Sequence, residues 1–223
     1  MILKNSSKIG IIGAGPAGLV TALALEAYCK SNEIMVEIIL MDKNKSAMDC
    51  PGVEYGIQAR ACLALKQIGI KQEALACGLN TFCISFFNAR TNKKQKFSIS
   101  TDPNLTVNVI RQEFLAGLTN LLSRTQIRRQ CNLKSIQTSA EKVNVLCKGS
   151  EGKDESFEFD ILVAADGIGS VVRKDYFKSE NYIHNRVFSC LYMLIEVPQE
   201  APKHFKEASN TGECMIVLGN QQQ

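Results

Sequence analysis

Apolar and polar positions in the first fifty residues follow the order strand, helix, strand. The short apolar run from Lys8 to Ile12 is typical of a buried parallel strand. Good helix formers follow from Leu19 to Tyr28, and a second apolar run extends from Met35 to Met41. This order predicts a complete β-α-β unit.

The remainder of the chain mixes helical and strand-like patterns. Helices are predicted at 60–68, with Gly69 as a C-terminal cap, and at 111–122 and about 170–177. Strands are predicted at 83–87, 95–100, 107–110, 127–136, 142–147, 156–159, 160–165, 187–197 and 214–218. The first two of these strands flank Asn92-Lys93-Lys94 and predict a hairpin. The mixture indicates an α/β sheet domain with a smaller β-rich domain inserted.

Composition and charge exclude several classes of protein. The 223 residues are 45% hydrophobic and 22% charged, which is ordinary for a globular chain. The net charge is only +4, there is no Trp, and the basic clusters 93–96 and 128–129 are short, so we interpret them as solvated loops and strand ends. Nucleic-acid binding is therefore not predicted.

Nine cysteines, an odd number without a Cys-x-x-Cys pair, favour neither a zinc site nor a disulfide framework. The two histidines have no ligand-like spacing, and no metal site is predicted. We expect reduced thiols and a cytoplasmic location. Glycines and a proline interrupt the apolar run 9–25, and no other segment approaches the roughly 18 apolar residues of a spanning helix. A soluble protein without a membrane span is expected.

A Gly13-x-Gly15-x-x-Gly18 motif lies between the first predicted strand and helix. Gly13 permits a tight turn, Gly15 lets the backbone approach a pyrophosphate, and Gly18 lets helix and strand pack closely. Pro16 is tolerated in the first helical turn, whose N–H groups favour an anion. Asp42 ends the second strand, 24 residues after Gly18, where a carboxylate can accept hydrogen bonds from a ribose. The motif alone leaves open FAD, NAD, and a plain glycine-rich turn.

A second carboxylate follows another buried strand. Asp166 comes after the apolar run 160–165 and before a turn, at the carboxyl end of a parallel strand, where ligands bind. Gly167 permits close backbone approach, and Ser170 is a plausible N-cap for the next helix. The alternative is that Asp166 is a cap or turn residue.

Three stretches resemble the single-component, FAD-dependent aromatic-ring monooxygenases, the p-hydroxybenzoate hydroxylase-like family that includes salicylate and kynurenine hydroxylases. Residues 159–173 resemble that family's D-x-x-V-x-A-D-G-x-x-S-x-V-R signature, and residues 56–70 and 109–115 match two further patterns in the same order. The resemblance implies a Rossmann-like FAD-binding domain of the glutathione reductase type, interrupted by a β-rich substrate domain. Its implied boundaries are 1–180 for the FAD-binding domain, with a hairpin near 81–104, and 181–223 for the start of the substrate domain.

The resemblance also implies which residues bind the cofactor. Asp166 and Gly167 would lie near the ribityl and pyrophosphate portion, and Arg111 would reach the flavin, unless it is a solvated helix-end arginine. For Arg173, a structural salt bridge and a cofactor contact are both open. The predicted cofactor-binding residues are Gly13, Gly15, Pro16, Ala17, Gly18, Asp42, Arg111, Asp166 and Gly167. No catalytic residue is predicted.

In this family, FAD reduced by NADPH or NADH reacts with O2, and one oxygen atom is transferred to a small aromatic substrate. The family's downstream Gly-Asp motif is not found before Gln223, so we expect a C-terminally incomplete, truncated form. The alternatives are another FAD oxidoreductase, such as an epoxidase or a ubiquinone-pathway hydroxylase, and a non-catalytic nucleotide-binding protein. An NAD-dependent dehydrogenase fits only about the first 45 residues. The oligomeric state is not indicated.

Overall fold

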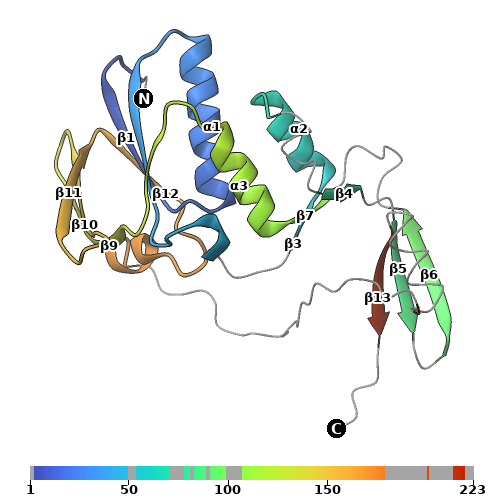
Figure 1. The fold of residues 1–223 in the computed structure, drawn as a ribbon. Helices are drawn as coiled ribbons and strands as arrows, with labels where there is room; N and C mark the ends of the chain where they lie inside the picture. The colour runs from blue at the N-terminus through green and yellow to red at the C-terminus, as the bar shows by residue number, and fades with distance from the viewer. Residues whose placement is uncertain are drawn as a thin grey trace. The chain divides into compact units, whose positions relative to one another are not determined.

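The computed structural model describes residues 3–49, 54–70, 78–80, 83–88, 91–98, 107–178, 200 and 213–218. The chain divides into two compact units (Figure 1). The first unit comprises 1–51 and 115–191, and the second comprises 52–114 and 192–223. The predicted strand at 187–197 lies outside the described residues. The domain boundary at 180/181 stays a prediction.

A four-stranded parallel sheet forms the centre of the first unit. Its strands are β1 (Ser7–Ile12), β2 (Val36–Met41), β8 (Gln126–Arg128) and β12 (Ile161–Ala164), in the order β12-β1-β2-β8. Helix α1 (Pro16–Ser31) connects β1 to β2, which confirms the predicted β-α-β unit. A short 3-10 turn, η1 (Ala47–Asp49), follows β2.

Helices cover one face of this sheet. Alternation along the strands directs one set of apolar side chains to this face, and the buried residues of α1 belong to the same layer. The fully or almost fully buried members are Ile9, Ile11, Ile38 and Leu40 from the strands and Leu19, Ala22 and Leu23 from α1. Figure 1 shows α1 and α3 (Arg111–Leu121) next to each other on this side. Buried Leu115 and Leu118 come from the part of α3 that belongs to the first unit.

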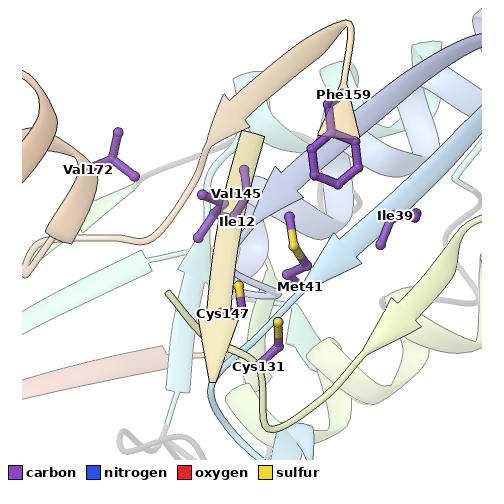
Figure 2. Close-up of a cluster of buried hydrophobic side chains, with 8 residues drawn as sticks. All are labelled: Ile12, Ile39, Met41, Cys131, Val145, Cys147, Phe159 and Val172. Atoms are coloured by element: carbon purple, nitrogen blue, oxygen red, sulfur yellow. The ribbon is translucent and has the colours of Figure 1, made fainter. Parts of the chain in front are cut away.

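An antiparallel meander covers the opposite face. It consists of β9 (Asn132–Thr138), β10 (Val143–Lys148) and β11 (Asp154–Phe159), in the order β11-β10-β9. Figure 2 shows the side chains that form the core on this face of the unit: Ile12, Ile39, Met41, Cys131, Val145, Cys147, Phe159 and Val172. A Cβ at Gly10 would lie 2.7 Å from the Phe159 ring, so the glycine makes room for the largest side chain of this core. The first unit is therefore built in three layers.

The predicted strand 127–136 is wrong as a single element. The structure divides it into β8 and β9, with a turn at 129–131 in which Gln130 adopts φ 56°. The polar run Arg128-Arg129-Gln130 interrupts the apolar pattern where the chain leaves the parallel sheet for the meander. The predicted helix at 170–177 is shorter than expected, because its regular part is a π-helical segment, η3 (Val172–Tyr176).

The second unit contains an antiparallel sheet and a helix. Strands β3 (Glu54–Ile57), β4 (Gly78–Asn80) and β7 (Val107–Ile110) pair in the order β3-β7-β4. Helix α2 (Ala59–Gln67) is followed by Gly69 with φ 80°, which confirms the predicted glycine cap.

A second three-stranded sheet belongs to the same unit. Strands β5 (Cys83–Asn88) and β6 (Lys93–Ser98) form the predicted hairpin. Strand β13 (Glu213–Leu218) pairs with β5 in parallel, so residues far apart in sequence join in one sheet. The predicted strand at 214–218 is thus confirmed.

A buried carboxylate holds the connection between α3 and β8. Glu26, on α1, is only 8% exposed and accepts hydrogen bonds from the backbone N–H groups of residues 123–125. The hydroxyls of Ser123 and Thr125 donate to the same carboxylate at 2.8 and 2.7 Å. Because several donors converge on it, the charge is compensated although it is removed from water.

We expect Glu26→Gln to lower the free energy of unfolding by about 2 kcal/mol at neutral pH, because an amide nitrogen cannot accept these bonds. Burial raises the pKa of the Glu26 carboxyl, but hydrogen bonds from residues 123–125 outweigh it and hold the pKa below its ordinary value. The stabilisation is therefore complete above the unfolded-state pKa and is lost as the pH falls through the lower folded-state pKa.

Urea unfolding of wild type and Glu26→Gln between neutral and acidic pH measures this difference. The exposed Glu33, just beyond the same helix, supplies the control Glu33→Gln, for which we expect no comparable loss. A wild-type advantage over Glu26→Gln that grew toward acidic pH would contradict the assignment.

Candidate cofactor-binding site

Three loops meet at one edge of the parallel sheet. They follow β1, β2 and β12, whose carboxyl ends lie at the same edge because the strands are parallel. The Gly13 N–H donates to the carbonyl of Met41 at 2.7 Å, and the Ala165 N–H donates to the carbonyl of Ile12 at 2.8 Å. The predicted glycine motif 13–18 and the segments that begin at Asp42 and Asp166 are thus brought together in one unit.

Two of the three motif glycines are required by packing within the protein. Gly13 has φ 101°, and a Cβ there would lie 2.4 Å from the carbonyl oxygen of Ala165. A Cβ at Gly18 would lie 1.8 Å from the carbonyl oxygen of Gly13. Neither position can hold a larger residue without moving the backbone.

Gly15 differs from both. It has φ −75° and ψ −177°, an extended conformation open to any residue, and a Cβ there would have no neighbour within 4 Å in the part of the chain that the structure describes. Helix α1 begins at the next residue, Pro16, with no side-chain hydrogen bond at its N-cap and no acidic residue in its first turn. Ala17 is exposed. The open backbone beside the positive end of a 16-residue helix can accommodate an anion such as a pyrophosphate.

Asp42 is held beside this loop. Its side chain is 9% exposed, its Oδ2 accepts a hydrogen bond from the Ala14 N–H at 2.6 Å, and its Oδ1 accepts one from the Asn44 N–H at 2.8 Å. A carboxylate has about four acceptor positions, so these two bonds leave capacity for the hydroxyls of a ribose.

Arg129 lies next to Asp42 and is not among the predicted site residues. Its Nη1 is 3.9 Å from Asp42 Oδ1, and its side chain is 21% exposed. From sequence, Arg129 belonged to the short basic cluster 128–129 within one predicted strand, 127–136. Recognising that the strand ends at Arg128 would have placed Arg129 at the carboxyl edge of the sheet.

Asp166 is a capping residue in the structure. Its Oδ1 accepts from the Ser170 hydroxyl at 2.6 Å, and its Oδ2 accepts from the Val172 N–H at 3.2 Å. The Ser170 hydroxyl in turn accepts from the Arg173 N–H at 3.0 Å, so Ser170 caps the helical segment as predicted. Gly167 has φ 81° and open space around its Cβ position. The Arg173 guanidinium donates to the carbonyl of Ile168.

Arg111 belongs to the second unit and is not a solvated arginine. It is half-buried, its Nε donates to the hydroxyl of Tyr55, and its guanidinium lies 5.4 Å from the centre of the Tyr55 ring. Tyr55 also packs edge-on against Phe114, with ring centres 6.2 Å apart. Sequence analysis did not predict Tyr55 as a partner. The contact of Arg111 with a cofactor stays a prediction.

Comparison with known proteins identifies the family of this chain. A family model described as "FAD binding domain" matches residues 6–216. The chain belongs to this FAD-binding domain family. A curated flavin-dependent monooxygenase from an unknown prokaryotic organism is 24% identical over 203 residues, which cover 88% of this chain and 49% of that protein. The chain thus spans about half the length of this relative.

Solved structures share the fold. The flavin-dependent monooxygenase PieE, solved with FAD and substrate, has a TM-score of 0.64 at 19% identity, over 77% of this chain and 32% of PieE. The p-nitrophenol 4-monooxygenase PnpA of Pseudomonas putida DLL-E4 has a TM-score of 0.62 at 18% identity, over 78% of this chain and 44% of PnpA. At these identities the likeness concerns the fold alone.

The predicted FAD-binding family and the predicted FAD-binding α/β fold are confirmed. The family match supports FAD as the cofactor. Within the described ranges, none of the helices is both long and apolar enough to cross a lipid bilayer.

The glycine geometry predicts that two alanine substitutions change the stability of the ligand-free protein by very different amounts. Gly18→Ala forces a methyl group into the Gly13 carbonyl and is expected to cost about 3 kcal/mol or more in the free energy of unfolding. Gly15→Ala adds a methyl group in open space and is expected to change that free energy by less than about 1 kcal/mol. Chemical denaturation of the two variants without cofactor measures both values, and equal destabilisation would contradict the placement of Gly15.

Proposed function

We propose that the chain is the FAD-binding portion of a monooxygenase that hydroxylates an aromatic or related ring substrate with NADPH or NADH and O2. The observation that carries the proposal is the open backbone at Gly15, at the uncapped start of α1 and beside Asp42. The family match and the monooxygenase relative support it.

The residues present fit FAD. The 13–18 loop would hold the pyrophosphate through backbone N–H groups, and Asp42 would accept hydrogen bonds from the adenosine ribose. Asp166 and Gly167 would lie near the ribityl chain, and Arg111 near the flavin, as the family resemblance implies. When bound, FAD supplies the transfer of electrons from NADPH or NADH to O2 and of oxygen to the substrate. The protein binds and orients these groups and limits the access of water.

A cytoplasmic location is part of the proposal. The buried cysteines Cys29, Cys62, Cys131 and Cys147 are free thiols. Cys131 and Cys147 lie together in the core (Figure 2), which fits a compartment that keeps thiols reduced.

A second candidate is an FAD-binding protein without hydroxylase activity of its own, or a different FAD oxidoreductase, such as an epoxidase or a ubiquinone-pathway hydroxylase. The family match concerns the FAD-binding domain and is compatible with either candidate. Substrate specificity depends on site residues rather than on the fold.

The purified chain is expected to take up FAD, which its visible absorption and the flavin released by heating would identify. Gly15→Ala is expected to weaken FAD binding at least roughly tenfold, because its methyl group would occupy space that the pyrophosphate needs. Titration of flavin fluorescence measures the dissociation constants. Since the same substitution is expected to leave the ligand-free fold intact, a loss of affinity reports on the site.

Each outcome separates the candidates. A chain that binds no added FAD contradicts the proposal, and one that binds NAD tightly instead supports a dehydrogenase. A chain that binds FAD but consumes no NADPH or NADH with any of a panel of phenolic substrates supports the non-catalytic candidate. Substrate-dependent NADPH or NADH consumption with hydroxylated product supports the monooxygenase.

A further inference from the structure

The backbone around Arg129 is fixed to the end of β2 on both sides. The Asp42 N–H donates to the carbonyl of Arg128 at 2.8 Å, and the Cys131 N–H donates to the carbonyl of Asp42 at 2.9 Å. The Gln130 N–H donates to the carbonyl of Asn44 at 3.2 Å. Three hydrogen bonds therefore tie residues 128–131 to the segment 42–44.

This turn contains an unfavourable backbone conformation. Gln130 has φ 56°, a left-handed value that is uncommon for a residue other than glycine, asparagine or aspartate. Such a conformation persists when the surrounding structure enforces it, and it is found often at functional sites. Here it lies where the chain leaves the parallel sheet for the meander, directly after Arg129, whose guanidinium lies beside Asp42.

The Arg129 guanidinium is close to Asp42 without occupying its acceptor positions. The distance of 3.9 Å between Nη1 and Oδ1 is an ion-pair distance and exceeds that of a hydrogen bond. The two side chains are 21% and 9% exposed, whereas those of the surface pair Lys134–Asp154 are 42% and 50% exposed. Because the Asp42 pair is shielded from water, its attraction is screened less than that of a surface pair.

We propose that Arg129 is a positioning residue for the adenosine end of the dinucleotide. Its charge holds the Asp42 carboxylate turned toward the ribose. The Ala14 and Asn44 N–H groups each occupy one acceptor position, on Oδ2 and Oδ1, and the remaining positions are available to the ribose. The inference rests on the proposed FAD site and adds a residue that determines its preference for an intact ribose. Arg128, the exposed last residue of β8, has no such role.

The test compares Arg129→Gln, Arg129→Lys and the control Arg128→Gln with wild type, each as the full 223-residue chain. Flavin fluorescence gives the dissociation constant of FAD, and displacement of FAD by ADP or by 2′-deoxy-ADP gives the preference for the ribose hydroxyl. Denaturation without ligand gives the stability of each variant. A residue that only supported the turn would change stability and would weaken both nucleotides alike.

In Arg129→Gln, we expect the dissociation constant of FAD to rise roughly tenfold, the scale of one hydrogen bond to a charged group. The wild-type preference for ADP over 2′-deoxy-ADP should be of the same order and should fall toward unity in this variant. Arg129→Lys should recover part of both losses, because it keeps the charge and loses the planar fork. Arg128→Gln should bind like wild type.

Unchanged FAD affinity in Arg129→Gln would overturn the inference and leave the proposed site intact. So would an equal loss of ADP and 2′-deoxy-ADP, which would assign Arg129 to the phosphates or to the fold. If Arg129→Gln does not fold, the same two comparisons in Arg129→Lys decide the matter. A wild-type chain that binds neither FAD nor ADP would overturn the proposed function itself, and this inference with it.

Discussion

The 2.6 Å hydrogen bond from the Ala14 N–H to the Asp42 carboxylate connects the two halves of the β-α-β unit where they must stay in register. The loop after β1 has no side chain of its own to anchor it, since its residues are glycine, alanine and proline. Its position depends on backbone contacts with the ends of β2 and β12 and on this one buried carboxylate. The start of α1, the space at Gly15 and the site of Arg129 all depend on where that loop is held.

The first unit contains two buried carboxylates, Glu26 and Asp42, that are stabilised in the same way. Glu26 and Asp42 are both less than one-tenth exposed, and backbone N–H groups of a neighbouring segment donate to each. Backbone donors are kept in any substitution except one to proline, and hydrogen bonds from them to a carboxylate are strong. The two carboxylates differ in what remains: Glu26 has donors on both oxygens from three consecutive residues, while Asp42 keeps acceptor capacity at the edge where ligands bind.

Much of this arrangement could be predicted from sequence. Long apolar runs and a glycine motif between strand and helix predicted β1, α1 and β2, because burial and local propensity act together there. The turn at 129–131 could not be predicted, because its conformation results from hydrogen bonds to residues 42–44, almost ninety positions earlier in the chain. For the same reason Arg129 was missed, and so was Tyr55, whose partner Arg111 is 56 residues away. For Asp166, the sequence left open a capping role and a cofactor contact, because the residue precedes both a turn with Ser170 and the rest of the family signature.

The three motif glycines carry different kinds of information. Gly13 and Gly18 are enclosed by the protein's own backbone, so their retention in a related sequence reports that the fold is retained. Among the described residues, nothing lies within 4 Å of a Cβ at Gly15, so a bound ligand gives a reason to keep this residue small. A descendant that no longer used the cofactor would be free to accumulate side chains at position 15 while 13 and 18 stayed constrained. The middle glycine therefore serves as a marker of selection for the ligand, readable in any set of relatives without an assay.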